Sequence, residues 1–377
     1  MMNSPKQTTI IGAGQAGATC ALKLRELGYT GAITLIGDER QPPYERPALS
    51  KGYLSGTIGL NDLVLLEPDA AKRQGIELFL GTPVREVDRR KKCLHANDRV
   101  IPYDTLVFAT GGRARRLPAA DILPAPSLTI RTIDDADRLR GFLGSISRAA
   151  VIGGGWLGLE LAATCRQAGA QVDLFEAADR LCARVAPAWL STQLTRLMEG
   201  LGVALHIGSP PGFSAGGILT ADGQIVVPDL VLKAVGMHPN DGLAMEAGLD
   251  CADGILVDST GHTADPSVFA IGDCARLGSQ PGPRRESWQN ANQSAEKVAR
   301  AILGLPQRAP EPDWFWSTIG TAKIQMIGVC SDEMHPVVET GSKPGSIACR
   351  YVKEERDAGC IAINYPKAIA QTRRNLT

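Results

Sequence analysis

Short apolar runs alternate with amphipathic stretches along most of the chain. The run TTIIGAG at 8–14 ends in glycines, and the amphipathic stretch QAGATCALKLRELG follows it. A second apolar run, AITLIGD, ends at Asp38. This order predicts a strand, a helix and a second strand, with the two strands paired in parallel through the helix.

The same plan occurs a second time. AAVIGGGWLGLELAATCRQAG at 149–169 repeats the pattern of 8–28, and the run VDLFE then ends at Glu176. Each copy carries G-x-G-x-x-G between the expected strand and helix, and an acid follows roughly 20 residues later, as in dinucleotide-binding βαβ units. One such motif could be a plain structural turn, but two complete copies favour two dinucleotide sites.

Each residue of the motif has its own physical role. The first glycine allows a tight turn, the second lets a pyrophosphate approach the free N–H groups of the helix, and the third lets helix and strand pack closely. The acid accepts hydrogen bonds from an adenosine ribose. These residues are Gly12, Gly14, Gly17 and Asp38 in the first copy, and Gly153, Gly155, Gly158 and Glu176 in the second.

Two further apolar runs end in turns that suit a ligand. TLVFATGG at 105–112 leads into Thr110 and Gly111, and SVFAIGDCA at 267–275 leads into Gly272 and Asp273. A carboxylate beside backbone N–H groups suits a ligand with hydroxyls and phosphates, such as the ribityl chain of a flavin. Either turn could also be an ordinary exit from a strand.

Composition excludes several classes of protein. The 377 residues include 40 basic and 40 acidic side chains, so no positive excess favours nucleic acid. No apolar run is long enough to span a membrane. The nine cysteines are scattered without a C-x-x-C pair, which indicates reduced thiols in a cytoplasmic protein, with no disulfide framework and no metal site.

The order of these motifs resembles the two-dinucleotide flavoprotein reductases of the glutathione-reductase fold. The segments ERPALSK (45–51), IRTIDDADRLR (130–140), RRESWQNANQSAEKVA (284–299) and DWFWS (313–317) narrow the match. They resemble the ferredoxin reductases of Rieske-type aromatic-ring dioxygenases and bacterial cytochrome P450 systems. Members of this family usually continue for some tens of residues beyond the point where the printed sequence stops.

The resemblance implies an α/β fold with two Rossmann-like dinucleotide-binding domains and a small C-terminal α+β domain. An FAD-binding domain is expected at 1–113 and 237–308, with an NAD-binding domain at 114–236 inserted into it. The proline-rich QRAPEPDW then leads to a C-terminal domain at 309–377, where strand-like alternation recurs.

The resemblance also assigns site residues. Lys51 is expected beside the reactive flavin nitrogen and paired with Glu160; otherwise they are a solvated loop lysine and an acid favoured by the helix dipole. Trp316 is expected at the flavin edge where a ferredoxin docks, unless the aromatic cluster with Trp314 and Phe315 only packs domains together. Further FAD contacts are expected from Ala16, Arg46, Val84, Thr110, Gly111, Arg131, Asp273, Glu286 and Trp288, and further NADH contacts from Leu157, Arg184 and Gly236. Judged by residue type alone, Val84 is plain strand packing and Arg184 could cap a surface turn.

The residues at 45–51 also bear on the route of the electrons. Disulfide reductases of this fold carry a cysteine pair in this region and NADH peroxidases carry one cysteine, whereas this segment has none. We therefore expect hydride transfer from NADH to FAD, then single electrons to a separate [2Fe-2S] ferredoxin of the Rieske type that feeds a terminal oxygenase. Alternatives are a reductase for a P450-system ferredoxin or for rubredoxin, an NADH oxidase, or an NADH-sensing flavoprotein.

The roles of several further residues stay open at the level of sequence. Trp156 lies inside the second glycine motif, where it could stack near the nicotinamide or narrow the entrance. Ser-Thr-Ile follows Trp316 where many relatives have Ser-Asp-Gln. Arg180 and Arg184 could accommodate a 2′-phosphate near Glu176. Arg284, Arg285 and Lys323 are candidate positive charges for steering an acidic ferredoxin.

Overall fold

The computed structural model describes residues 6–279 and 284–376, and the chain divides into two compact units. Unit 1 comprises Met1–Arg46, Gly59–Arg113 and Met237–Ala309. Unit 2 comprises Pro47–Ile58, Ala114–Gly236 and Pro310–Thr377.

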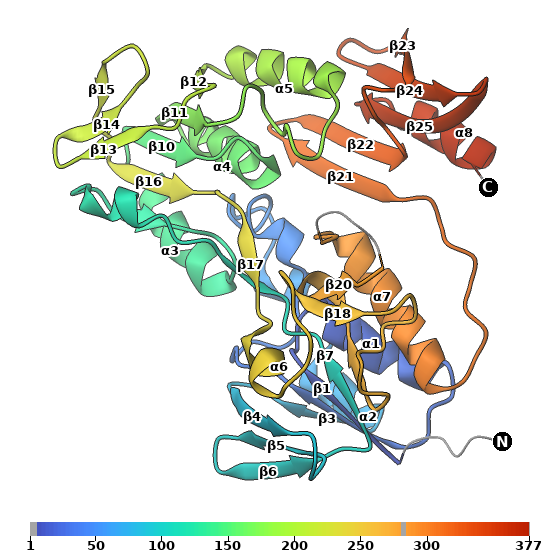
Figure 1. The fold of residues 1–377 in the computed structure, drawn as a ribbon. Coiled ribbons are helices and arrows are strands. Elements are labelled where there is room, and N and C mark those ends of the chain that lie inside the picture. The colour runs from blue at the N-terminus through green and yellow to red at the C-terminus, as the bar shows by residue number, and fades with distance from the viewer. Residues whose placement is uncertain (1–5, 280–283, 377) are drawn as a thin grey trace. The chain divides into compact units, whose positions relative to one another are not determined.

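Unit 1 is built on a five-stranded parallel sheet in the order β19-β7-β1-β2-β3 (Figure 1). These strands are Val268–Ala270, Thr105–Phe108, Gln7–Ile11, Ala32–Ile36 and Ile76–Phe79, respectively. Helices α1 (Gln15–Glu26) and α7 (Trp288–Ile302) cover one face through a shared apolar core. Ser287 caps α7 by accepting a hydrogen bond from the backbone N–H of Asn290 at 3.0 Å.

The opposite face of this sheet packs against smaller elements through a second apolar core. The antiparallel sheet β4-β5-β6 lies on this side, formed by Val84–Asp88, Cys93–Ala96 and Arg99–Pro102. The remaining elements of unit 1 are α2 (Pro68–Arg73), α6 (Gly242–Glu246), β8 (Gly112–Ala114), β17 (Met237–Pro239), β18 (Ile255–Val257), β20 (Ala275–Leu277) and the 3₁₀ turns Leu60–Leu63 and Gly272–Cys274; a third, Arg46–Ala48, crosses into unit 2.

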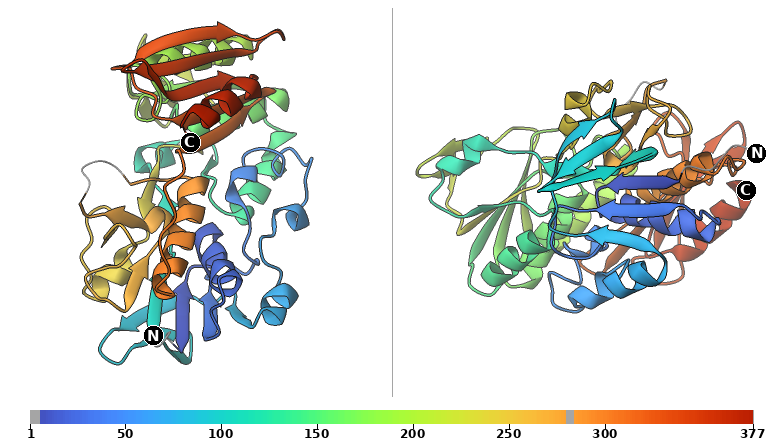
Figure 2. Two further views of the ribbon diagram at one scale, coloured as in Figure 1. Left: turned by 90° about the vertical axis from the view of Figure 1, so that its right-hand side faces the viewer. Right: turned by 90° about the horizontal axis from the view of Figure 1, so that it is seen from below.

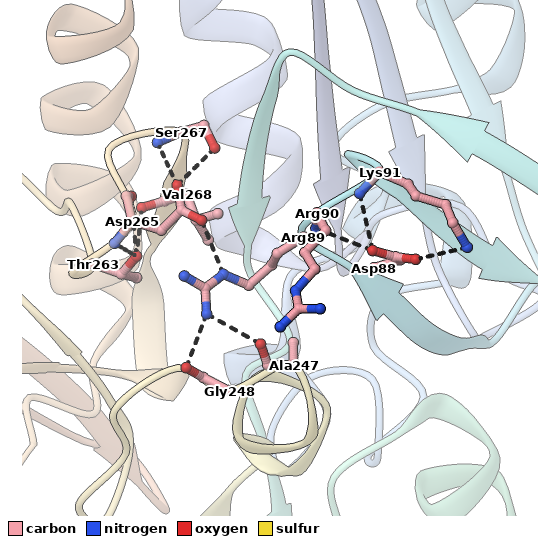
Figure 3. A network of polar contacts seen from close by, with 10 residues as sticks. All are labelled: Asp88, Arg89, Arg90, Lys91, Ala247, Gly248, Thr263, Asp265, Ser267 and Val268. Carbon is pink, nitrogen blue, oxygen red and sulfur yellow. Dashed lines mark hydrogen bonds and ion pairs between the residues drawn. The ribbon is translucent and has the colours of Figure 1, made fainter.

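A network of polar contacts around Arg89 and Asp265 links segments of unit 1 (Figure 3). Arg89, just after β4, donates to Asp265 at 2.9 Å and to the carbonyls of Ala247 at 3.2 Å and Gly248 at 2.9 Å. Burial alone would raise the pKa of Asp265, but hydrogen bonds from Ser267 and Arg89 hold it below its usual value. One guanidinium thus joins three segments that are distant in sequence.

Unit 2 repeats the sheet of unit 1. Its parallel order β12-β11-β10-β16-β9 has β10 and β11 where unit 1 has β1 and β2. These strands are Val203–Ile207, Gln171–Glu176, Arg148–Ile152, Leu230–Lys233 and Ser127–Leu128. The elements around this sheet are α3 (Ile133–Leu143), α4 (Trp156–Gln167), α5 (Ala188–Gly200), the 3₁₀ turn Pro118–Ile122 and the small sheet of β13 (Gly212–Ser214), β14 (Gly217–Leu219) and β15 (Ile225–Val226).

The C-terminal part of unit 2 is an antiparallel five-stranded sheet in the order β21-β22-β25-β24-β23. Helix α8 (Pro366–Leu376) packs on one face of it over a small apolar core (Figure 2). The strands are Trp314–Ile319, Ala322–Gly328, Arg356–Ile363, Ile347–Lys353 and His335–Thr340. The expected α/β fold, with its internal repeat and a C-terminal α+β region, is confirmed.

Residues 310–377 fall in unit 2 with 114–236, and one further segment is grouped differently from the expected domains. Residues 47–58 cluster with unit 2 rather than with the rest of 1–113. The physical reason is a set of polar contacts: Ser50 and Lys51 bind Glu160, and Tyr53 donates to Asp137 at 2.8 Å. Across the described ranges, no helix has the length and apolar character needed to cross a membrane.

Candidate functional site

The first glycine motif leaves open space at the start of α1. Gly12 has φ +112°, and an ideal Cβ there would lie 2.1 Å from the carbonyl oxygen of Ala109. A Cβ on Gly17 would lie 1.9 Å from the carbonyl oxygen of Gly12. At Gly14, by contrast, the nearest atom of the described residues is Nη2 of Arg46, 4.0 Å away. Only glycine fits at Gly12 and Gly17, and Gly14 offers room for a ligand.

Arg46 is held beside this loop in its charged form. It donates to Glu39 at 2.5 Å and to the Tyr44 hydroxyl at 3.0 Å. Burial alone would lower the pKa of Arg46, but Tyr44 and Glu39 outweigh burial and raise it. A guanidinium next to free helix N–H groups is suited to a pyrophosphate. Sequence reasoning named Arg46 but missed Glu39, although the two consecutive acids after β2 were a visible signal.

The two acids expected to bind ribose, Asp38 and Glu176, are not in equivalent positions. Ile11 pairs with Ile36 in unit 1 and Ile152 with Phe175 in unit 2, so the counterpart of Glu176 is Gly37. A Cβ on Gly37 would lie 2.6 Å from the Cβ of Ala13, which stands where the second loop has a glycine. The first acid therefore moves one residue along the chain, to the exposed Asp38.

The turn at Gly272 lies against the same loop. A Cβ on Gly272 would be 3.0 Å from that of Ala16, and the Gly272 N–H donates to Ser294 of α7 at 3.0 Å. The turn at Thr110 is fixed by Asn240, whose carbonyl accepts from the Thr110 hydroxyl at 2.6 Å. Asp273 follows Gly272 directly, so unit 1 gathers these groups at the carboxyl ends of its parallel strands, where ligands of such sheets bind.

The other residues expected to contact FAD lie in different parts of the structure. Val84 packs against the second apolar core, in agreement with the structural alternative. Glu286 accepts from Arg284 at 2.6 Å, and Trp288 begins α7. Arg131 lies in unit 2, just before the helix cap of α3.

The residues of unit 1 fit FAD. The glycine cradle is open at Gly14, a charged guanidinium lies beside it, and a carboxylate follows at Asp273. In addition, Oε1 of Gln15 is buried without a hydrogen-bond partner among the described residues, although its Nε2 donates to Asn292 at 2.8 Å. A buried acceptor at the start of the loop is a group that a bound polar ligand can satisfy.

The second glycine motif is built in the same way. Gly153 has φ +111°, and a Cβ on Gly158 would lie 1.9 Å from the carbonyl oxygen of Gly153. Gly155 caps α4, and no atom of the described residues lies within 4 Å of an ideal Cβ there. Leu157 is the second residue of this helix and is half-buried.

Glu176 is fixed at the edge of this loop. Its carboxylate accepts from the backbone N–H of Gly154 at 2.6 Å and of Ala178 at 2.8 Å. Arg184 lies beside Gly236, since its Nη2 is 3.7 Å from the position of a Cβ on that residue. Arg180 is committed elsewhere, donating to the Ala186 carbonyl at 2.6 Å and to Ser191 at 2.8 Å. An open glycine loop with an anchored acid fits NAD(H).

Lys51 and Glu160 form an ion pair. The Nζ of Lys51 lies 2.7 Å from Oε1 of Glu160 and donates to the Pro47 carbonyl at 2.9 Å. Ser317 also donates to Oε1, at 2.6 Å, and Ser50 donates to Oε2 at 2.5 Å. The Glu160 side chain is only 7% exposed, so these three donors replace the water that a carboxylate would otherwise need.

Strand β21 places its aromatic residues on two faces. Phe315 contacts Trp156 of the second glycine motif, with ring centroids 4.7 Å apart and planes inclined by 38°. Trp314 and Trp316 alternate with Phe315 and stack on each other at 4.8 Å and 20°. Trp156 thus contacts an aromatic residue of β21, and this contact could not be predicted from the sequence.

One proposed steering charge is corrected. The Arg284 side chain is 3% exposed and binds Asp253 and Glu286, so it presents no free positive charge to a partner. Arg285 and Lys323 are exposed.

The cysteines are present as free thiols. All nine lie in the described part of the chain and none forms a disulfide. Burial raises the pKa of Cys20, Cys165 and Cys182 to about 12, so these thiols are protonated at neutral pH. Over residues 6–279 and 284–376, no three or more His, Cys, Asp and Glu side chains form a group that could hold a metal ion.

Comparison with known proteins places the chain in a family. Residues 6–295 match the pyridine nucleotide-disulphide oxidoreductase model, and residues 314–377 match the reductase C-terminal model. A probable ferredoxin reductase of Castellaniella defragrans is 37% identical over 98% of this chain and 93% of its own. The ferredoxin–NAD(+) reductase subunit of the benzene 1,2-dioxygenase system of Pseudomonas putida is 36% identical over 97% and 91%.

Solved structures agree. The covalent putidaredoxin reductase–putidaredoxin complex has a TM-score of 0.90 at 33% identity, over 99% of this chain and 93% of the other. The ferredoxin reductase of the CYP199A2 system from Rhodopseudomonas palustris has the same TM-score at 34% identity, over 98% and 93%. The chain therefore belongs to the pyridine nucleotide-disulphide oxidoreductase family and, within it, to the ferredoxin reductases of dioxygenase and cytochrome P450 systems.

Proposed function

We propose that the protein is an NADH-dependent ferredoxin reductase. It is an oxidoreductase whose cofactors are FAD and NAD(H), and its electron acceptor is an iron–sulfur ferredoxin. The observation that carries this function is Lys51, which lies in the segment where disulfide reductases of this fold carry reactive cysteines and which pairs with Glu160 of α4. With no thiol in that segment, electrons leave for a separate carrier.

Each unit holds one cofactor in this proposal. In unit 1, the loop at Gly14 and the Arg46 guanidinium hold the pyrophosphate of FAD, and Asp273 receives hydroxyls of its ribityl chain. In unit 2, the loop at Gly155 receives NADH and Glu176 accepts from its ribose. Because a 2′-phosphate would meet the Glu176 carboxylate, the site favours NADH over NADPH.

Lys51, Glu160 and Trp316 have roles in electron transfer in this proposal. A bound FAD would supply the chemistry that links the two-electron donor NADH to a one-electron iron–sulfur carrier. Lys51 places a cation where negative charge develops during this transfer, and Glu160 keeps its ammonium oriented. Trp316 marks the route by which electrons reach the ferredoxin.

The type of ferredoxin and the location of the protein can also be proposed. We assign a [2Fe-2S] ferredoxin of the Rieske type that feeds an aromatic-ring dioxygenase, and a cytoplasmic location in keeping with nine unpaired cysteines. The second candidate partner is a P450-system ferredoxin, which the likeness to putidaredoxin reductase favours.

A turnover assay with two ferredoxins tests the proposal. The purified holoenzyme should reduce a Rieske-type [2Fe-2S] ferredoxin with NADH, and a P450-type ferredoxin more slowly. Faster reduction of the P450-type protein would reverse the finer assignment. Transfer to neither ferredoxin, with rapid consumption of dioxygen, would instead identify an NADH oxidase.

A further inference from the structure

We propose that Ser317 is a positioning residue for the Lys51–Glu160 pair and ties that pair to the strand carrying Trp316. The proposal rests on the function proposed above, in which Lys51 supplies a cation where negative charge develops. The sequence analysis assigned no role to the Ser317 hydroxyl. Many relatives share this serine but differ at the two residues that follow it.

The first argument is the crowding on one carboxylate oxygen. Oε1 of Glu160 accepts from Lys51 at 2.7 Å and from Ser317 at 2.6 Å, while Oε2 accepts from Ser50. Ser317 is 1% exposed, so water cannot take its place readily. Removing the hydroxyl would leave the Lys51 ammonium as the remaining donor to Oε1, and the carboxylate could then turn about its terminal bond.

The second argument is that one face of α4 contacts one face of β21 at two places. Trp156 and Glu160 are four residues apart in α4 and therefore share a helix face. Phe315 and Ser317 are two residues apart in β21 and share a strand face. Trp156 meets Phe315 and Glu160 meets Ser317, so one aromatic contact and one hydrogen bond join the helix to the strand.

The third argument is the charge around Glu160. Lys51 is its cationic partner, and Cys182 is a titratable group that interacts with it electrostatically. Burial, with smaller contributions from Glu176 and Glu160, raises the pKa of the Cys182 thiol to about 12, so this group is neutral. The orientation of the Glu160 carboxylate therefore depends on Lys51 and on the hydroxyls of Ser50 and Ser317.

Three variants of the holoenzyme test the inference. Ser317→Ala removes the hydroxyl, Ser317→Thr keeps it, and Thr318→Ala removes a hydroxyl from the next residue, on the opposite face of β21. Two quantities are measured: the limiting rate of flavin reduction by NADH together with the NADH Kd, and amide hydrogen exchange in residues 314–319.

Ser317→Ala should lower the limiting rate about tenfold, with the NADH Kd changed less than about twofold, because the glycine loop and Glu176 are untouched. Exchange in 314–319 should rise several-fold. Ser317→Thr should restore both quantities, and Thr318→Ala should match the wild type. In a Glu160→Gln background, Ser317→Ala should cause no further loss of rate.

The inference is overturned if Ser317→Ala behaves as the wild type, if Thr318→Ala has the same effect, or if a folded, yellow Ser317→Thr does not restore the rate. Failure of the proposed function is a separate result, namely a wild-type flavin that NADH does not reduce. The exchange comparison still decides in that case whether Ser317 holds β21 to α4.

Discussion

At the scale of single residues, we expect Glu176 to set the choice of coenzyme. Its carboxylate is anchored by two backbone N–H groups, so it cannot swing away from a ribose phosphate without losing both bonds. We expect NADH to be preferred over NADPH by about 30- to 1,000-fold in kcat/KM, which corresponds to about 2–4 kcal/mol. Glu176→Ala should reduce this preference to below about tenfold, as measured by steady-state kinetics with both coenzymes.

Asp179 provides a matched control, because it is an exposed acid three residues further along. Asp179→Ala removes the same charge but should leave the preference unchanged. Equal efficiency of the wild type with both coenzymes would mean that Glu176 does not face the ribose.

A second prediction for single residues concerns Arg89 and how its contribution to stability depends on pH. The pKa of Asp265 is lowered in the folded state, so its stabilising effect is present above the unfolded pKa, near 4, and is lost as the pH falls through the folded pKa. Arg89→Ala should cost about 1–3 kcal/mol at pH 7 and less at pH 3. Thermal unfolding of both proteins at the two pH values measures the difference.

The neighbouring Arg90 is exposed, and only its backbone N–H binds Asp88. Arg90→Ala should therefore leave the unfolding temperature within about 1–2 °C at both pH values. An Arg89→Ala cost that stays constant from pH 7 to pH 3 would show that Asp265 is not the partner that matters.

At the scale of elements, a substitution in one glycine motif should impair the binding of one cofactor and leave the other bound. A Cβ at Gly158 or at Gly17 would lie 1.9 Å from a backbone carbonyl oxygen, so either loop must shift to accept alanine. We expect Gly158→Ala to stay yellow and to raise the Kd for NADH at least about tenfold, and Gly17→Ala to lose FAD. Flavin absorbance and NADH titration measure both effects.

Gly141 in α3 is the control glycine, since nothing among the described residues lies within 4 Å of an ideal Cβ there. Gly141→Ala should bind both cofactors and be as stable as the wild type or more so. Loss of FAD from Gly158→Ala would mean that the second loop is not a separate site.

The sequence predicts the elements better than it predicts their partners. Both βαβ units follow from local pattern, since apolar runs, glycines and acids all lie within about 30 residues. The placement of Asp38 relative to Glu176 depends on strand register and on Ala13, which no spacing reveals. The contacts of Ser317 and Trp156 join segments more than a hundred residues apart, so only the fold brings them together.

At the scale of the whole molecule, the entry and the exit of electrons should be separable. Trp316 stacks on Trp314, on the face of β21 opposite to Phe315. Trp316→Ala should leave flavin reduction by NADH within about twofold and slow ferredoxin reduction at least about tenfold. Raising the salt concentration should slow only the second step, because association with an acidic partner is screened. Slower flavin reduction with unchanged ferredoxin transfer would place Trp316 on the nicotinamide side.

The central claim is that electrons enter as a pair from NADH and leave singly to a ferredoxin. A double-mixing stopped-flow experiment under anaerobic conditions tests it most directly. The holoenzyme is first mixed with one equivalent of NADH and then with excess oxidised [2Fe-2S] ferredoxin, and the flavin and iron–sulfur absorbances are followed. The account predicts rapid flavin bleaching in the first mix and two reduced ferredoxins per NADH in the second. A flavin that is reduced by NADH but leaves the ferredoxin oxidised would contradict it.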